Sequence, residues 1–298
     1  MGYLIALIPP FLDSVAIYVD KFLLSKHEIN STIITLYSGF FAFVAGLLIW
    51  FFLGFYFIDA KSAIIIAAAG FLGIFYLFAY FKALTYDEGS RVGSLFQLVP
   101  VIVLFLSFVF LGEKLHPKQY IGAILVVIAG FSLSLQRDDL GKFKLNKAFW
   151  FMLLSSFLSA MVYVSFKLGV MDVGFWQALP YEGLGSGLAM FSILFYGKNF
   201  RLLIKSKKLF KTKALTYMTI VELLSRVSRY ILFLALSLIP ASIASVLMGV
   251  QPLFLLILGL CLSLFFPHLI KEVIDKKTVV FKLLAFFIIL VGLSLIFL

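Results

Sequence analysis

The most restrictive feature of this sequence is its long, uninterrupted apolar runs. One run, at residues 63–84, reads AIIIAAAGFLGIFYLFAYFKAL and contains a single charged residue, Lys82. Such a run matches the roughly 20 mainly apolar residues of a membrane-spanning helix, whereas a membrane β-strand shows about ten residues of alternating polarity. The chain as a whole is 63% hydrophobic and 13% charged, whereas soluble domains carry about 25% charge. We therefore predict an all-α integral membrane protein that crosses the bilayer several times.

The apolar runs divide the 298 residues into ten predicted transmembrane segments. They cover residues 2–24, 32–55, 62–84, 91–111, 118–135, 147–167, 174–196, 214–237, 242–265 and 278–297. The loops between them are too short for a soluble domain of useful size. The first segment has no basic leader and carries Asp13 just past its apolar run, so we expect it to remain as the first span.

Several kinds of chemistry find no support in the sequence. The single Cys261 excludes an internal disulfide, and His27, His116 and His268 fall in predicted loops without metal-like spacing. No segment matches a nucleotide-binding Walker motif, so ATP hydrolysis is not expected as an energy source. The acidic residues are scattered, which argues against a membrane-embedded enzyme. We expect no cofactor, no metal ion and no enzymatic activity.

The formal net charge of +11 has its first explanation in membrane topology, so we expect no nucleic-acid partner. The loops after the first, third, fifth, seventh and ninth segments, with their flanks, hold 19 Lys and Arg, and the other loops hold four. Taken alone, this asymmetry places those odd loops in the cytoplasm and both termini outside. The most basic loop, residues 196–215, could instead face a lipid surface for its own reasons.

The two halves of the chain repeat each other. Residues 81–105 align with 233–257 at a constant offset of 152, and residues 11–21 align more weakly with 157–167. The matched pairs of the first alignment are Phe81/Phe233, Ala83/Ala235, Leu84/Leu236, Ser90/Ser242, Leu95/Leu247 and Pro100/Pro252. Two five-helix units follow, at 1–137 and 147–298, joined by a connecting loop at 138–146. Because five is odd, the second unit enters the membrane in the opposite orientation, which is the inverted repeat of many transporters.

Pro100 and Pro252 occupy equivalent places inside the fourth and ninth segments. Each proline removes a backbone donor and leaves an earlier carbonyl without its usual partner, so we expect a kink in both helices. Such kinks either shape a cavity or are packing features that neighbouring helices tolerate.

With these features the sequence resembles the drug/metabolite transporter superfamily, and within it the ten-helix EamA branch. The residues that carry the resemblance are FKALTYDEGS, LVPVIVLFLSFVFLGEKL and YIGAILVVIAG, echoed in the second half by FLALSLIPAS, VQPLFLLI and LVGLSLI. The resemblance extends over essentially the whole chain. It implies a secondary transporter with a cavity lined by the first, third, fourth, sixth, eighth and ninth helices. It also implies cytoplasmic termini, in disagreement with the loop charges, and the orientation stays open.

One predicted segment carries three charges, in the stretch VELLSRVSRY at residues 221–230. At 100° per residue, Glu222, Arg226 and Arg229 share an arc of about 60° on one face of the helix. A central arginine is costly in a bilayer, so this stripe must face the bundle interior or a wet cavity. The equivalent positions of the first half carry no charge, which favours substrate recognition or coupling over a purely structural ion-pair network.

Partners for the stripe are available elsewhere in the sequence. Glu222 can neutralise one arginine through an i, i+4 pair, and Asp13 or Glu182 can neutralise the other. Asp13 is also a candidate proton-coupling group, ahead of Glu182 and Glu222, because a carboxyl beside an apolar cavity can exchange a proton. Further polar candidates, which packing hydrogen bonds would explain equally well, are Tyr80, Gln97, Gln177, Tyr181 and Gln251.

Three other features are assigned structural roles. Asp20 and Lys21, at the end of the first segment, are expected at the water interface. Glu113, which the resemblance marks within LGEKL, is expected to cap or order a helix junction. The glycine-rich stretches at 39–46 and 183–187 are expected to permit close helix packing.

These observations predict a secondary transporter in the cytoplasmic membrane that moves a small-molecule solute by alternating access, with protons as a candidate coupling ion. The mixed charges favour an amino acid or another anionic or zwitterionic metabolite. Export is the expected direction of transport. The alternatives are a transporter of a phosphate-bearing, nucleotide-linked or lipid-linked sugar and, from another class, a non-transporting scaffold or receptor. The expected partners are the solute and membrane lipid.

Overall fold

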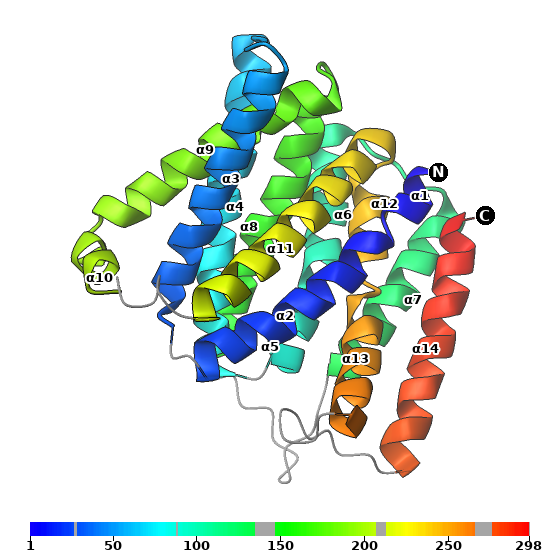
Figure 1. Ribbon diagram of the computed structural model, residues 1–298. Coiled ribbons are helices and arrows are strands. Elements are labelled where there is room, and N and C mark those ends of the chain that lie inside the picture. Colours follow the sequence, from blue (N-terminus) through cyan, green and yellow to red (C-terminus); the bar gives the residue numbers. More distant parts are fainter. Residues whose placement is uncertain (27–28, 88, 135–146, 207–212, 266–275, 298) are drawn as a thin grey trace.

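The computed structural model describes residues 1–26, 29–87, 89–134, 147–206, 213–265 and 276–297. Every element in these ranges is a helix, which confirms the predicted all-α class (Figure 1). The helices are α1 (Gly2–Ile5), α2 (Ile8–Lys26), α3 (Ser31–Phe52), α4 (Ala60–Tyr86), α5 (Gly89–Leu95), α6 (Leu98–Leu111), α7 (Pro117–Ser134), α8 (Lys147–Val170), α9 (Phe175–Phe195), α10 (Asn199–Lys205), α11 (Lys213–Leu238), α12 (Ala241–Met248), α13 (Gln251–Phe265) and α14 (Lys276–Phe297). The predicted connecting loop at 138–146, with His27 and His268, lies outside the described residues.

Many of these helices are long and apolar enough to cross a bilayer. Six candidate spans cover Gly2–Leu24, Ser31–Phe52, Ala60–Tyr86, Lys147–Val170, Phe175–Phe195 and Ala241–Gly259. Three shorter apolar helices cover Leu98–Leu111, Pro117–Ala129 and Phe287–Phe297. Helix α11 is 26 residues long and carries the three charges of the stripe. The chain is therefore a multi-pass membrane protein, while the number of ten spans remains a prediction.

Three predicted segments are each divided into two helices by a break of two residues. In each case a proline lies in the first turn of the second helix: Pro9 in α2, Pro100 in α6 and Pro252 in α13. We expected a kink inside a continuous helix at Pro100 and at Pro252. The structure instead has a break before each proline, where one helix ends and another begins. A helix accepts proline in its first turn because the N–H that proline lacks has no intrahelical partner there.

The helix ends follow the sequence repeat. Helices α4 and α11 end 152 residues apart, and α5 and α12 begin 152 residues apart. The two turns are held alike, each by a lysine ammonium that donates to two carbonyl oxygens at the end of the preceding helix. The bonds run from Lys21 Nζ to Leu84 O (2.8 Å) and Asp87 O (2.7 Å), and from Lys167 Nζ to Leu236 O (2.8 Å) and Ile239 O (3.1 Å). A cation is favourable there because the carbonyls of a helix C-terminus carry partial negative charge.

Glu113 connects the two halves of the chain. Its carboxylate accepts hydrogen bonds from the backbone N–H groups of Ala241 (2.7 Å) and Ser242 (3.0 Å), and from the Ser242 hydroxyl (2.5 Å). These are the first residues of α12, so Glu113 caps that helix from a distant part of the sequence. This confirms the expectation that Glu113 orders a helix junction.

Helix α9 packs closely against α3 and α4. A Cβ atom on Gly46 would lie 2.8 Å from the Cα of Gly183, so only glycine fits where α3 and α9 meet. A Cβ atom on Gly185 would lie still closer to a backbone atom, the carbonyl oxygen of Ala67 in α4. The glycine-rich stretches therefore permit close helix packing, as predicted.

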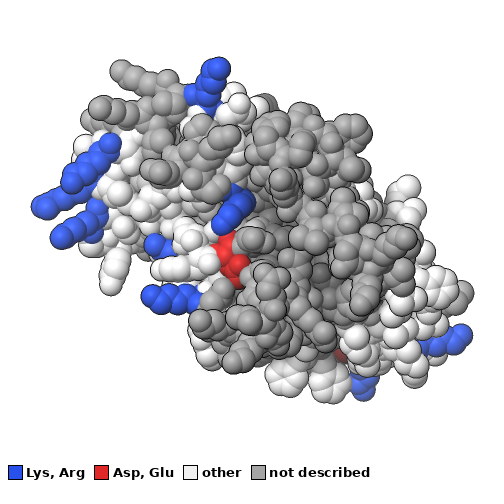
Figure 2. All heavy atoms as spheres, turned by 90° about the horizontal axis from the view of Figure 1, so that it is seen from below, with Lys and Arg blue, Asp and Glu red and all other residues white. Residues whose placement is uncertain are grey.

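The outer surface and the two ends of the bundle differ in chemistry. Large apolar side chains such as Phe105, Phe108 and Phe287 are more than half exposed, as expected for side chains that face lipid. Both termini and the α3–α4 loop lie at one end, whereas the C-terminal ends of α2 and α13 lie at the other (Figure 1). Seen at this second end, Lys and Arg side chains project from the rim of the molecule (Figure 2).

Candidate functional site

A cavity of about 120 Å³ lies between the helices. A single water needs roughly 10–15 Å³ of such space, so this cavity has room for several waters or a small solute. Residues of α2, α4, α6, α8, α11, α12 and α13 line it, which are the helices implied by the resemblance, and α3 contributes in addition. Its polar lining consists of Asp13, Asp20, Ser38, Tyr76, Tyr80, Ser159, Tyr163, Glu222, Ser225, Arg226, Arg229 and Gln251.

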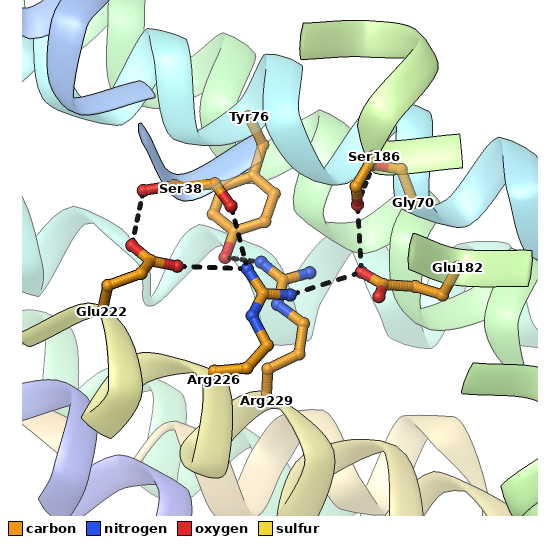
Figure 3. A network of polar contacts seen from close by, with 8 residues as sticks. All are labelled: Ser38, Gly70, Tyr76, Glu182, Ser186, Glu222, Arg226 and Arg229. Atoms are coloured by element: carbon orange, nitrogen blue, oxygen red, sulfur yellow. Dashed lines mark hydrogen bonds and ion pairs between the residues drawn. The ribbon is translucent and has the colours of Figure 1, made fainter. Parts of the chain in front are cut away.

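The charged stripe of α11 divides into two parts, and the first is an ion-pair network around Arg226 (Figure 3). The guanidinium lies 3.2 Å from Glu222 Oε1 on its own helix and 3.8 Å from Glu182 Oε1 on α9. The second oxygen of Glu222 accepts a 2.7 Å hydrogen bond from the Ser38 hydroxyl. All three charged side chains are buried. Arg226 is therefore held between two carboxylates and joins α11 to α3 and α9.

Glu182 reaches this network from behind the cavity wall. The Ser186 hydroxyl lies 3.4 Å from Glu182 Oε1 and 3.2 Å from the carbonyl oxygen of Gly70. Within the described part of the chain, Glu182 Oε2 and Arg226 Nε are buried without a hydrogen-bond partner. Glu182 thus contacts the cavity wall through Arg226.

Arg229 forms the second part of the stripe and has different surroundings. Its guanidinium donates a hydrogen bond to the Tyr76 hydroxyl (Figure 3). It lies 5.0 Å from the centre of the Tyr76 ring and 5.7 Å from that of the Phe233 ring. No carboxylate of the described residues lies within the 4.0 Å ion-pair distance of Arg229. The side chain is only partly buried and lines the cavity, so it presents an unpaired positive charge there.

Asp13 lies on α2, which packs against α11. Its Oδ1 accepts a 2.5 Å hydrogen bond from the hydroxyl of Ser228, the residue next to Arg229. No ion pair links Asp13 to a lysine or arginine in the described part of the structure. The expectation that Asp13 or Glu182 would neutralise the second arginine is not met among the described residues, because Glu182 pairs with Arg226, the arginine that Glu222 already contacts.

Asp20 was expected at the water interface, but the structure places it inside the helix bundle. It is only 6% exposed, lines the cavity, and accepts a 3.1 Å hydrogen bond from the Tyr80 hydroxyl. The sequence contained a signal for this position, because seven residues on a helix bring Asp20 back to within about 20° of Asp13. The physical reason is that α2 runs six residues beyond Asp20, to Lys26, so Asp20 lies inside the helix bundle rather than at its end.

The weaker polar candidates fall into two groups. Gln251 and Tyr80 line the cavity, and Gln97 is buried beside it, where its side-chain amide donates to the carbonyl oxygen of Gly249 at 2.9 Å. Tyr181 instead bonds to backbone atoms of the α3–α4 loop, and Gln177 lies in the first turn of α9. Neither of them lines the cavity, which no residue of α9 does in the described part of the chain.

Comparison with known proteins places these features in a wider group. Residues 1–135 match the model of the EamA-like transporter family. A curated relative from Buchnera aphidicola subsp. Schlechtendalia chinensis, named "Uncharacterized transporter in trpA 3'region", is 31% identical over 105 residues. The match covers 35% of this chain and 34% of that relative, so it spans about a third of the relative's length.

The fold also has a counterpart among solved structures. One crystal structure, described only as that of a protein, superposes with a TM-score of 0.64 over 97% of this chain and 98% of the other. The two sequences are 15% identical, so the likeness concerns the fold alone.

Proposed function

We propose that the chain is a secondary transporter of a small zwitterionic metabolite, such as an amino acid, because its residues 1–135 match the model of the EamA-like transporter family. The solute occupies the cavity between the helices and reaches alternate sides of the cytoplasmic membrane in turn. Two inverted five-helix units, 1–137 and 147–298 with a connection at 138–146, move against each other around it. The equivalent helix ends and the paired lysines Lys21 and Lys167 support this division.

The observation that carries the substrate class is the guanidinium of Arg229 at the cavity wall, which has no ion-pair partner in the described part of the chain. A guanidinium can hold a carboxylate by two parallel hydrogen bonds. Asp13 and Asp20 line the same cavity and would repel a solute with several negative charges, such as a sugar phosphate. A solute with one carboxylate and one cationic group suits this wall best.

Flux in reconstituted vesicles tests this proposal. The purified protein is offered labelled amino acids, organic acids, sugar phosphates and lipophilic cations, and uptake is compared with that of Arg229→Gln. We expect uptake of a zwitterion that falls by at least about tenfold in the variant, since a charge-assisted hydrogen bond contributes roughly 1.5–3 kcal/mol. Asp59→Asn is the matched control, because Asp59 is an exposed carboxylate outside the cavity.

The outcomes separate the alternatives. A substrate that Arg229→Gln transports as well as the wild type would contradict the role of Arg229, and uptake of sugar phosphates alone would favour the phosphate-bearing class. Absence of flux for every solute, together with specific binding of a protein partner, would favour the scaffold or receptor.

Export and proton coupling belong to the same proposal. Asp13 is the candidate coupling group because it lines the cavity without an ion-pair partner among the described residues. Uptake driven by an imposed pH gradient, and lost in Asp13→Asn, would support coupling. Flux that is indifferent to the gradient would contradict it.

A further inference from the structure

Asp20 is a buried carboxylate for which the structure provides no positive partner. It is 6% exposed, and no ion pair joins it to a lysine or arginine in the described ranges. The Tyr80 hydroxyl donates to one of its oxygens. The other titratable groups that act on it are the carboxylates of Glu222 on α11 and Asp13 on its own helix. A carboxylate in such a place is stable only when a cation or a proton accompanies it.

The register of α2 against α11 shows where Asp20 lies relative to Arg229. The helices pack antiparallel, since Asp13 bonds to Ser228 while the ring of Phe22 lies 6.0 Å from that of Tyr217. Asp13 therefore lies level with Arg229, and Asp20 lies two helical turns further along, near the level of Glu222. Seven residues at 1.5 Å each separate the two levels by about 10 Å.

The charges around the cavity do not balance. Four carboxylates line it or contact its wall (Asp13, Asp20, Glu182 and Glu222), against the two guanidiniums of Arg226 and Arg229. Arg226 is already bound by Glu182 and Glu222, and Arg229 stands at the level of Asp13. The uncompensated negative charge is therefore located at the level of Asp20.

We propose that Asp20 and Tyr80 form a cation subsite in this cavity, about 10 Å along the helix axes from Arg229, which holds the positive group of a solute whose carboxylate is bound at Arg229. This inference rests on the proposed function and deepens it. It selects solutes in which the ammonium group is well separated from the carboxylate, because a short α-amino acid cannot reach both levels at once. A proton is the other source of positive charge that the same subsite can bind.

The subsite is built as a binding wall. The Tyr80 ring lies 5.0 Å from that of Phe81 and 5.6 Å from that of Phe96, and all three line the cavity. Phe96 lies in the break between α5 and α6. These rings limit the access of water to Asp20, and a low local dielectric strengthens its attraction for a cation.

Ligand-induced thermal stabilisation of the purified protein tests the proposal. The probes are ω-amino acids of increasing length, from glycine to 8-aminooctanoate, each paired with the carboxylic acid that lacks the amino group. The variants are Asp20→Asn, which keeps the side-chain shape, and Tyr80→Phe, which keeps the ring; Asp59→Asn is the control. We expect the wild type to bind a long ω-amino acid at least about tenfold more tightly than its amine-free partner, and Asp20→Asn to abolish that preference.

The two sources of positive charge give different results. If Asp20 instead binds a proton, the unfolding temperature of the ligand-free wild type depends on pH, and Asp20→Asn removes that dependence. In that case the amino group of the probe makes no difference to its binding. A variant that retains both the preference for the amine and the pH dependence would overturn the subsite. Should Asp20→Asn fail to fold, Tyr80→Phe takes its place and is expected to weaken the same preference in part.

Failure of the inference is distinguishable from failure of the proposed function. Suppose that the wild-type protein transports a solute, binds glycine as tightly as 8-aminooctanoate, and is not changed by Asp20→Asn. The transporter assignment would then stand, and the cation subsite would be wrong. Absence of flux for every solute would contradict the proposed function. The pH dependence of the unfolding temperature would still test Asp20 as a proton site.

Discussion

Arg226 and Arg229 lie three residues apart on one face of α11, yet their surroundings give them different roles. Arg226 is buried between Glu222 and Glu182, whereas Arg229 contacts Tyr76 and Phe233 at the cavity wall and has no ion-pair partner among the described residues. The first arrangement holds helices together, and the second leaves a charge available to a solute. We therefore expect the stability of the protein to depend on Arg226 and ligand binding to depend on Arg229.

The substitution Arg226→Gln is expected to lower the free energy of unfolding by about 3–5 kcal/mol, because it leaves two buried carboxylates without their cation. Thermal unfolding in detergent measures the loss, with Arg229→Gln as the matched control at a partly buried position on the same face. An Arg226→Gln variant as stable as Arg229→Gln would show that the ion pairs contribute little to the fold.

The Ser38 hydroxyl supports the same network from α3. Ser38→Ala removes the donor to Glu222 Oε2 and is expected to cost about 1–3 kcal/mol, the usual penalty for a buried acceptor left without its donor. Combination with Arg226→Gln in a double-mutant cycle measures their coupling. Strictly additive losses would contradict a shared network.

The same residues show what sequence reasoning could and could not find. The stripe of α11 followed from helical spacing and the cost of charge in a bilayer, and it does line the cavity in part. Which arginine Glu182 would contact could not be predicted, because that depends on how α9 packs against α11. Asp20 was missed because it was assigned to the water interface at the end of its segment, although its seven-residue spacing from Asp13 was visible.

At the scale of single elements, short helices depend on side chains from distant parts of the sequence. Helix α12 has eight residues, and its first two N–H groups are bound by Glu113. Glu113→Ala is expected to destabilise this helix start by roughly 1–2 kcal/mol, the usual range for a lost N-cap. Hydrogen exchange should increase at the amides of Ala241 and Ser242, while Glu113→Gln, which keeps one acceptor, should lose less. Unchanged exchange in Glu113→Ala would contradict the cap.

Asp59 caps the start of α4 and gives that helix end a pH dependence. The backbone N–H of Ser62 donates to its carboxylate at 2.9 Å, and this bond is the main reason that the pKa of Asp59 lies below its ordinary value. A lowered pKa means that the cap is complete above the unfolded value of about 3.9 and is lost as the pH falls through the folded value. Amide exchange at Ser62, corrected for its intrinsic pH dependence, should therefore gain protection as the pH rises through this range. The same profile in Asp59→Ala would contradict the assignment.

The breaks between elements were harder to predict than the elements. The long apolar runs indicated helices correctly, and most predicted segments match a helix within a few residues. The positions of Pro100 and Pro252 signalled an irregularity, but a kink and a break differ in how the two flanking turns pack, which a single sequence does not reveal. The internal repeat was the stronger guide, since the helix ends on either side of these turns fall 152 residues apart.

At the scale of the whole molecule, the charges of the two ends bear on its orientation. The loops after the odd segments carry 19 Lys and Arg against four in the others. In the structure the termini and the α3–α4 loop share one end, and basic side chains project from the other (Figures 1 and 2). Because short basic loops stay in the cytoplasm, the physical argument favours external termini, although the family resemblance implied the reverse.

Labelling of single cysteines decides between these orientations. In a Cys261→Ser background, Lys61→Cys reports on the start of α4 and Lys198→Cys on the far end of α9, and both lysines are exposed. A membrane-impermeant maleimide added to intact cells is expected to label Lys61→Cys and to reach Lys198→Cys only after permeabilisation. The reverse pattern would place the termini in the cytoplasm and the basic loops outside. Those loops would then need another explanation, such as contact with anionic lipid at the outer surface, because the positive-inside bias would no longer account for them.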